Sequence, residues 1–119
     1  AARLAYRLPV TGRLIAGFGE ISAAGVRARG LTITTRAGAQ VVAPGAGRVL
    51  YAAAYRGFGH IVIIDHGGGW ISLVTGLAGV SAAVGDQLDQ GGPIGRAGTA
   101  VTVELRHGGQ PVDIVPLVS

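Results

Sequence analysis

The sequence predicts an all-β domain with little or no helix, and three observations carry that prediction. Twenty-two glycines are spread along the 119 residues, between short runs of β-branched and aromatic side chains, which is typical of many strands joined by turns. No window combines a 3.6-residue apolar period with caps at both ends, so a long helix is not expected. The segment HIVIIDHGGGWISLV, residues 60–74, joins two apolar runs through three glycines and predicts an antiparallel hairpin.

The expected strands follow one another along the whole chain, separated by turn residues such as Pro44-Gly45, which favour a bend. In chain order they are residues 13–18, 31–36, 39–43, 47–55, 60–66, 70–77, 93–98 and 101–107. The length fits a single domain with one hydrophobic core.

Composition excludes several classes of protein. Hydrophobic residues make up 49% of the chain and charged residues 13%, which excludes a disordered segment. The longest apolar run, residues 49–55, is too short to span a bilayer, so no membrane span is expected. Cysteine is absent, which excludes both disulfides and thiolate metal sites. Because the chain does not begin with Met, we expect it to be an excised or processed part of a longer protein.

The net charge is +4, and all ten basic residues are arginines scattered along the chain. A nucleic-acid binder would show a basic run or stripe interleaved with aromatics, so nucleic acid is not an expected partner. Solvated charge that maintains solubility is one interpretation. A mildly basic face for an acidic partner or an anionic polymer is the other.

Three histidines are available for chemistry: His60, His66 and His107. Asp65 and His66 are adjacent on an expected strand, so their side chains point to opposite faces and do not predict a metal cluster. His107 lies at the Arg-His-Gly-Gly turn, where we expect it to be solvated.

The order of turns and strands resembles a known family. The segments that carry the resemblance are LPVTGRLIAGFGE, RGLTI, VVAPGAGRVLYAA, GFGHIVIIDHGGGWISLV, VSAAVGDQLDQGGPIGRAG and VELRHGGQPVDIVPLV. They resemble the LytM domain of lysostaphin-like zinc endopeptidases, which cut peptidoglycan cross-links. The resemblance implies an antiparallel sheet with a central groove, formed by residues 8–118 after an N-terminal extension of residues 1–7. It also implies a structural hydrogen-bonding role for His66.

The resemblance further implies that the zinc chemistry of the family is lost. Active members hold zinc with a histidine and an aspartate four residues apart and with the second histidine of a His-x-His pair; two other histidines assist. Carried onto this sequence, these positions fall on Ala28, Thr32, Gly76, Ala100 and Thr102. None of these side chains ligates zinc well or moves protons near pH 7. We therefore expect neither catalysis nor a cofactor.

Inactive members of the family are known as murein hydrolase activators. The resemblance implies that this domain binds a peptidoglycan amidase through the emptied groove and draws away the autoinhibitory helix of the amidase. It implies an upstream coiled coil, outside this sequence, that recruits the activator to the division machinery. It also implies the periplasm of a Gram-negative bacterium and a role in cell separation.

The residues expected to line the partner-binding groove are Arg27, Arg29, Tyr55, Phe58, Val74 and Arg106. The arginines suit acidic groups on a partner helix, and the aromatic residues suit anchors. For Tyr55 and Phe58 the alternative is packing within their own hairpin. Glu104 and Asp113 are expected to satisfy backbone groups near turns.

Two other functions remain open at this stage. A peptidoglycan-binding module would have kept affinity for the substrate after losing catalysis. A residual hydrolase would need a metal that these residues do not obviously hold.

Overall fold

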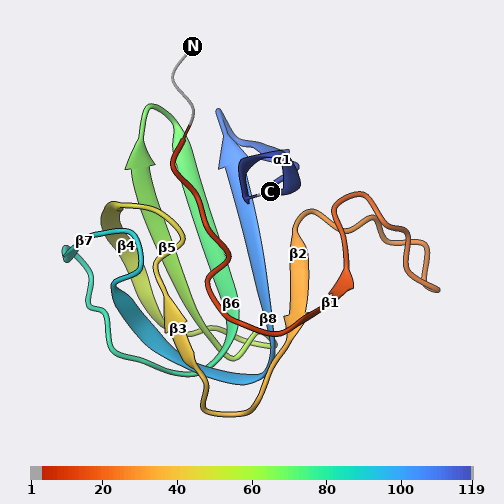
Figure 1. Cartoon of the computed structure of the whole chain (residues 1–119), viewed down its shortest axis with the longest axis horizontal. Coiled ribbons are helices and arrows are strands. Elements are labelled where there is room, and N and C mark those ends of the chain that lie inside the picture. Colours follow the sequence, from red (N-terminus) through yellow and green to blue (C-terminus); the bar gives the residue numbers. More distant parts are fainter. Residues whose placement is uncertain (1–3, 119) are drawn as a thin grey trace.

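A computed structural model describes residues 4–118. In this part of the chain nine strands form one sheet, every strand pairing is antiparallel, and a single turn of helix follows near the C-terminus (Figure 1). The elements are β1 (Arg13–Ala16), β2 (Leu31–Thr34), β3 (Gln40–Val42), β4 (Gly47–Ala54), β5 (His60–Gly67), β6 (Trp70–Val80), β7 (Gln87–Leu88), β8 (Pro93–His107), β9 (Gln110–Val112) and α1 (Val115–Val118). The predicted all-β class is confirmed.

Strand β8 is the centre of the sheet. The strand order is β1-β2-β8-β6-β5-β4-β7, and β3 and β9 also pair with β8 near its two ends. The two strands expected over residues 93–98 and 101–107 are therefore one strand, because β6 pairs along both parts of it. Strands β7 and β9 were not expected, since two or three residues are too few to form a recognisable apolar run.

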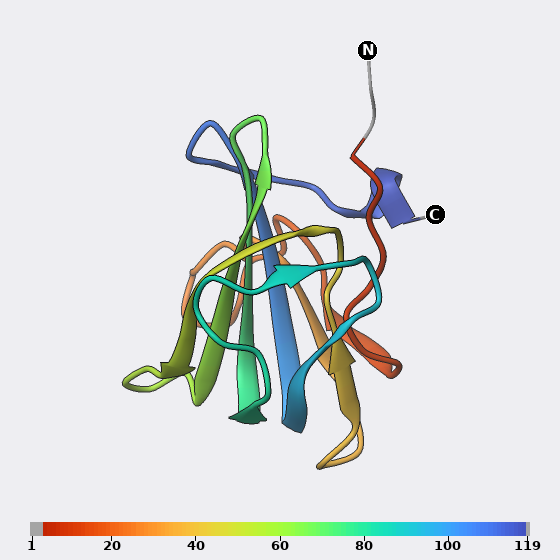
Figure 2. The same cartoon turned by 90° about the vertical axis from the view of Figure 1, so that its left-hand side faces the viewer.

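The sheet has one buried face and one open face. Along β8, Val101, Val103 and Leu105 are fully buried, while Thr102 and Glu104 alternate with them and lie on the other face. The buried face is covered by the N-terminal segment, by residues 81–92 and by α1, all of which lie on the same side of the sheet (Figures 1 and 2).

The packed domain begins earlier than expected. Tyr6 is buried in the core and Leu4 packs against it. The backbone N–H of Arg7 donates to the carbonyl of Pro44 at 2.9 Å. The boundary predicted at Leu8 is thus wrong for the described part of the chain, and residues 1–3 of the expected extension lie outside it.

The hairpin predicted for residues 60–74 is confirmed as the pairing of β5 with β6. Its turn contains Gly67, Gly68 and Gly69, whose φ angles are 86°, 63° and 83°. These values lie in the left-handed region, which glycine enters without steric penalty. The three glycines are therefore required by the turn geometry.

Candidate functional site

The candidate site is the open face, formed by the outward residues of β2, β8, β6 and β5. Two projections rise beside it. The first is the arm, residues 17–28, between β1 and β2, and the second is the aromatic loop, residues 55–59, between β4 and β5. Figure 2 shows that both project on the side of the sheet away from the N-terminal segment and α1. We call the open face the floor, and the arm and the aromatic loop its two walls.

Three threonines from three neighbouring strands lie side by side on this floor. Thr102 of β8 is paired with Thr32 on β2 and with Thr75 on β6. The Oγ1 atoms of Thr32 and Thr102 are hydrogen-bonded at 2.9 Å. The structure therefore brings together two of the positions that the resemblance assigns to zinc ligands. Their hydroxyls are directed at each other.

Gly76, the position that the resemblance assigns to a catalytic histidine, has no room for any side chain. Its φ is 83°, and a Cβ atom added to it would lie 2.1 Å from the carbonyl oxygen of Ala100. The backbone of β8 passes directly against it, because Gly98 leads into the rest of the strand without an intervening loop. A shallow hollow remains there, lined by residues 57–59, 75–77 and 98–100.

Ala28 lies in the arm, outside β2. Its N–H donates to the carbonyl of Glu20, and its own carbonyl accepts from Gly19, both at 2.8 Å. Both backbone groups of Ala28 thus hold the arm together, and its methyl side chain offers no ligand.

The residues present do not fit zinc. Within residues 4–118 no group of three or more His, Cys, Asp or Glu side chains is arranged to hold a metal ion. Zinc in proteins is bound by imidazole, thiolate and carboxylate, whereas the corresponding positions here carry two hydroxyls, two methyl groups and a glycine hydrogen. We therefore assign no metal-dependent step to this site.

His66 belongs to a partly buried hydrogen-bonded chain on the covered side. Its Nδ1 lies 2.8 Å from the carbonyl oxygen of Ala46, and its Nε2 lies 2.6 Å from Ser72 Oγ. Ser72 Oγ in turn lies 2.5 Å from the hydroxyl of Tyr6. A carbonyl only accepts, so Nδ1 carries the proton, Nε2 accepts from Ser72, and Ser72 accepts from Tyr6. The expected structural role of His66 is confirmed.

Burial shifts both titratable members of this chain toward their neutral forms. Desolvation lowers the pKa of His66 below its ordinary value of 6.5, against smaller opposing effects of the Ala46 hydrogen bond and the Asp65 charge. Desolvation also raises the pKa of Tyr6 above its ordinary value of 10.0, partly offset by the hydrogen bond to Ser72. His107, expected to be solvated, is exposed and stacks on Trp70 with ring centroids 3.8 Å apart.

Val74 was wrongly predicted to line the groove. It is fully buried and faces the core, because the alternation along β6 turns Leu73 and Thr75, not Val74, toward the open face. Arg106 does lie on the open face, where it forms an ion pair with Glu104 two residues earlier on the same strand. The carboxylate of Glu104 thus binds the Arg106 side chain, and the prediction that it satisfies a backbone group was wrong.

Arg27 and Arg29 are exposed on and beside the arm. The Nη1 atom of Arg27 donates to the carbonyl of Gly19 at 3.1 Å, which ties the two halves of the arm together. Neither arginine has a carboxylate partner in the described chain, where Arg106 and Glu104 form the single ion pair. Asp113 accepts a hydrogen bond from the N–H of Val115 at 3.1 Å, which is the backbone role predicted for it.

Tyr55 and Phe58 form the exposed tip of the aromatic loop. Their side chains are 54% and 55% exposed, and their ring centroids lie 6.0 Å apart. Tyr51 of β4 continues the cluster, 6.4 Å from Tyr55 in an edge-to-face arrangement. The two rings contact each other, but more than half of each remains free for another contact.

The apolar side chains of the arm were missed by the sequence analysis. Phe18, Ile21 and Val26 are 36%, 62% and 66% exposed. In the sequence they are indistinguishable from core residues, because hydrophobicity alone does not report which side chains a neighbouring element covers. The strong glycine and alanine content around them was the available sign of a surface loop.

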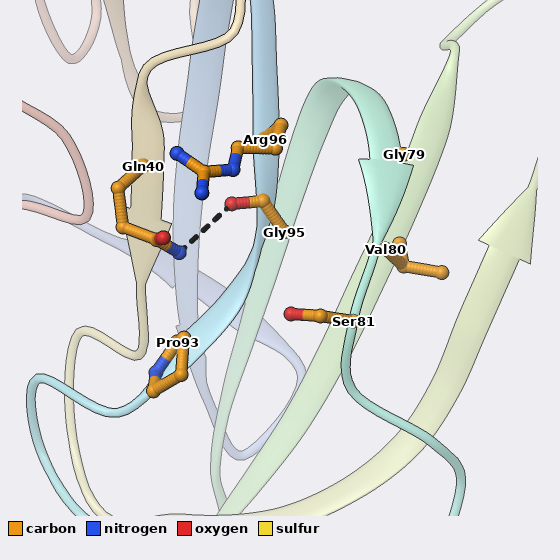
Figure 3. Close-up of a pocket in the computed structure, with 7 residues that line it drawn as sticks. All are labelled: Gln40, Gly79, Val80, Ser81, Pro93, Gly95 and Arg96. Carbon is orange, nitrogen blue, oxygen red and sulfur yellow. Dashed lines mark hydrogen bonds between the residues drawn. The ribbon is translucent and has the colours of Figure 1, made fainter.

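A second hollow lies at the foot of the sheet, between β3, β8 and the end of β6 (Figure 3). Gln40 donates to the carbonyl of Gly95 at 3.1 Å, as drawn in Figure 3. Arg96, the one charged residue that lines the hollow, donates to the carbonyl of Gly38 at 3.4 Å. No carboxylate or imidazole lines this hollow, and we assign it no role.

Comparison with known proteins identifies the class to which this fold and site belong. Residues 26–114 match the Peptidase family M23, and the chain is a member of that family. The predicted resemblance to lysostaphin-like LytM domains is thereby confirmed.

Two solved structures superpose on nearly the whole chain. A putative peptidase M23 from Pseudomonas aeruginosa is 27% identical, with a TM-score of 0.81 over 98% of this chain and 51% of the other. Csd3 of Helicobacter pylori has a TM-score of 0.87 over 98% of this chain and 33% of its own, at 17% identity, and shows the shared fold alone.

Three relatives by sequence come from Gram-negative bacteria. An uncharacterized protein of Haemophilus influenzae is 40% identical over 98 residues, 82% of this chain and 24% of the relative. Murein hydrolase activator EnvC of Escherichia coli is 31% identical over 115 residues, 91% of this chain and 27% of the relative. Outer membrane antigenic lipoprotein B of Haemophilus influenzae is 29% identical over 122 residues, 97% of this chain and 29% of the relative.

The chain thus spans about a quarter of the length of these relatives. Two of them are named for envelope functions, one as a murein hydrolase activator and one as an outer membrane lipoprotein. No helix found within residues 4–118 has the length and apolarity needed to cross a membrane.

Proposed function

We propose that this domain is a non-catalytic activator of a peptidoglycan (N-acetylmuramoyl-L-alanine) amidase. A regulatory segment of the amidase docks on the open face, and its removal from the amidase uncovers the catalytic site of that enzyme. The activity supports septal cell-wall splitting in the periplasm of a Gram-negative bacterium.

The observation that carries this proposal is the state of the former ligand positions on the open face. The hydroxyls of Thr32 and Thr102 are hydrogen-bonded to each other, and the backbone of Ala100 excludes any side chain at Gly76. These three positions therefore carry small, neutral groups that do not ligate a metal, while the walls beside the open face carry uncovered apolar groups. Exposed apolar patches with a polar rim are characteristic of protein interaction sites.

The aromatic side chains and the arginines contribute to binding in different ways. Tyr55 and Phe58 act as anchors, because large aromatic rings contribute most to binding when a partner desolvates them. Arg27 and Arg29 attract and orient an acidic partner, which affects the association rate more than the affinity. Arg106 is partly neutralised by Glu104, so it contributes a directed hydrogen bond more than net charge.

The name of the EnvC relative supports this direction, since the match includes 91% of this chain. That relative is named for activating murein hydrolases and not for hydrolysing murein itself. The emptied ligand positions of this chain also suit a protein that activates a hydrolase and does not hydrolyse murein itself.

Dye release from labelled peptidoglycan tests the proposal. Each amidase of the same organism is assayed alone, with this domain, and with the domain lacking Phe58 as Phe58→Ser; the domain alone is assayed with added zinc. We expect release only with amidase and intact domain together. Release by the domain alone with zinc would make it a hydrolase and overturn the proposal.

A peptidoglycan-binding role is the second candidate. It is favoured by Arg27 and Arg29, which have no carboxylate partner among the described residues and suit an anionic polymer as well as an acidic protein. It predicts that the isolated domain sediments with purified sacculi at physiological salt. Sedimentation without stimulation of any amidase would favour this role over activation.

A further inference from the structure

We infer that the outer edge of β4 pairs with the same edge of a second copy of this domain, so that two sheets join into one about a two-fold axis. This interface lies at the margin of the sheet, outside the floor. It goes beyond the proposed function, because it forms between two copies of this chain and requires no amidase.

Strand β4 leaves most of its outer edge without a neighbouring strand. On its inner side it pairs with β5 from Arg48 to Ala54, whereas on its outer side β7 pairs with its first two residues alone. Val49 is bonded on the outer side to the turn at residues 85–86, at 2.8 and 2.9 Å. Within the described part of the chain, residues 50–54 are therefore an open edge.

The backbone groups of Ala52 and Ala54 point outward along this edge. The N–H of Tyr55 donates inward to the carbonyl of Gly59 at 2.8 Å, and successive residues of a strand direct their backbone groups to alternate sides. The carbonyl of Ala54 accepts from the hydroxyl of Tyr51, in its own strand, at 3.1 Å. A carbonyl oxygen has a second lone pair, so this one can accept from a neighbouring strand as well.

This edge lacks the features that usually prevent strand pairing. The segment LYAAAY, residues 50–55, contains no charged residue and no proline, and both blunt an exposed edge. Strand β1, at the opposite end of the sheet, is half as long as β4 and begins with Arg13. The register shift of β4 lies at Leu50 and does not interrupt residues 51–54. The β4 edge is therefore open to another strand.

A second copy of the same edge complements it in an antiparallel register. With the two-fold axis at Ala53, Ala52 of each copy faces Ala54 of the other. The outward backbone groups then bond in pairs, and each contact occurs twice, as two-fold symmetry requires. Tyr51 faces Tyr55 of the second copy, and aromatic pairs across neighbouring strands stabilise a sheet.

The arginines at the two ends of the edge favour this register. An axis at Ala52 would set Arg48 of each copy against Arg56 of the other, and like charges directly opposite each other are unfavourable. With the axis at Ala53, Arg56 faces Leu50 of the second copy instead. The edge between the two arginines is uncharged, so it complements an uncharged strand, and its own copy is such a strand.

Pairing of this kind extends the sheet without turning it over. Residues directly opposite each other in two paired strands lie on the same face. The open faces of the two copies therefore point to the same side. Such a dimer presents two candidate sites to one surface, which raises the overall affinity when both are engaged.

Single cysteines test the register, because the natural chain has none. Ala53→Cys places two cysteines on the axis, in a non-hydrogen-bonded pair whose Cα atoms lie about 4.5 Å apart, a distance that a disulfide spans. Ala54→Cys is the control. Its side chain is more exposed than that of Ala53, but the two copies of residue 54 lie diagonal to each other at about 7–8 Å, too far for a disulfide.

Both cysteine variants are incubated in a glutathione redox buffer, and the disulfide-linked dimer is measured by non-reducing electrophoresis. We expect at least about five-fold more dimer from Ala53→Cys than from Ala54→Cys, because only the first pair meets the geometry of a disulfide. Collision between exposed thiols would give the opposite order, since Ala54 is the more exposed residue.

Sedimentation equilibrium of the wild-type domain, from about 1 μM to about 1 mM, measures the association itself. Ala53→Arg sets two like charges against each other on the axis, and we expect it to weaken the dimer about ten-fold or more. Ile15→Arg adds the same charge on β1, where Ile15 is 54% exposed, and should stay within about two-fold of wild type. Thermal unfolding verifies that both variants fold.

Each outcome decides the inference. A concentration-dependent dimer that Ala53→Arg weakens and Ile15→Arg does not supports it. A wild type that stays monomeric over the whole range overturns it and leaves the edge to a strand of a different protein. Equal dimerisation of Ala53→Arg, or equal cross-linking of the two cysteine variants, contradicts the register. All of these measurements use the domain alone, so they fail or succeed independently of amidase stimulation.

Discussion

The two faces of the sheet treat polar groups in opposite ways. On the covered side, Tyr6, Ser72 and His66 form a closed hydrogen-bonded chain that ends on the carbonyl of Ala46. On the open side, the hydroxyls of Thr32 and Thr102 are hydrogen-bonded to each other, and Arg106 forms an ion pair with Glu104. The covered face has kept polar groups that hold the fold together. At the positions that the resemblance assigns to zinc and catalysis, the open face carries small neutral groups such as those of Thr32, Gly76 and Thr102.

The same contrast applies to apolar groups. The covered face buries its valines, leucines and isoleucines almost completely. The apolar side chains of the arm and the aromatic side chains of the loop are exposed. Burial of this kind stabilises the domain by about 25 cal/mol per Å² of apolar surface. The exposed groups contribute little to that stability, and they are free to contribute to binding.

The strongest test of this contrast is to place a side chain at Gly76, the position that the resemblance assigns to a catalytic histidine. Gly76→Ala places a Cβ atom 2.1 Å from the carbonyl oxygen of Ala100, and we expect it to lower the free energy of unfolding by about 3 kcal/mol or more. Gly25→Ala is the control, since Gly25 has a similar φ of 80° and nothing within 4 Å. It should cost only the left-handed strain of about 1–2 kcal/mol. Equal losses in urea denaturation would mean that β8 does not close this position.

A second test breaks the polar chain of the covered face. Ser72→Ala leaves the Tyr6 hydroxyl and the His66 Nε2 buried without a partner, which should lower the free energy of unfolding by about 1–3 kcal/mol. Ser81→Ala removes an exposed hydroxyl and should change stability by less than about 0.5 kcal/mol. Thermal and denaturant unfolding of the two variants measure the difference. A neutral Ser72→Ala variant would show that the chain does not contribute to stability.

The protonation of His66 gives the same chain a pH dependence. Burial lowers the pKa of His66 below 6.5 in the folded state, so the unfolded chain takes up a proton at a higher pH than the folded one. The contribution to stability is therefore complete above pH 6.5 and declines as the pH falls toward the lower folded-state pKa. Urea midpoints between about pH 5 and pH 7.5 should reveal this decline.

His66→Gln is expected to flatten the pH dependence in this range, because the titrating group is gone. His107→Gln, the matched substitution at an exposed histidine outside this chain, gives the background against which the effect of His66→Gln is measured. A slope that survives in His66→Gln would assign the pH dependence to other groups.

The smallest effect is expected on the open face. Thr102→Val removes the hydrogen bond to Thr32, but the Thr32 hydroxyl can still bond to water. The free energy of unfolding should therefore fall by less than about 1 kcal/mol. Thr75→Val, on the neighbouring strand, is the control without that partner. A loss as large as that of Ser72→Ala would contradict the difference between the two faces.

Much of the fold could be predicted because its signals are local. Glycine turns and apolar runs fix the β5–β6 hairpin and most strands within a few residues. The orientation of adjacent apolar residues is not local, so Val74 was assigned to the wrong face. Leu73, Val74 and Thr75 lack a clear alternation, and only the pairing of β6 with β5 and β8 decides which of them turns inward.

The contacts of the candidate site could not be predicted from the sequence. The resemblance assigns Thr32 and Thr102 to ligand positions, and the structure places these two residues beside each other. The partner of Ser72 is Tyr6, 66 residues away, and no sequence period reports such a contact. The exposed arm was missed for a related reason, since exposure depends on what the rest of the chain leaves uncovered.

Hydrogen–deuterium exchange of this domain, alone and with the amidase that it stimulates, tests the central claim most directly. Docking on the open face predicts slower exchange in residues 17–28 and 55–59, with residues 81–92 on the covered side unchanged. Protection confined to the covered side, with both walls exchanging as in the free domain, would contradict the claim that the emptied open face is the binding surface.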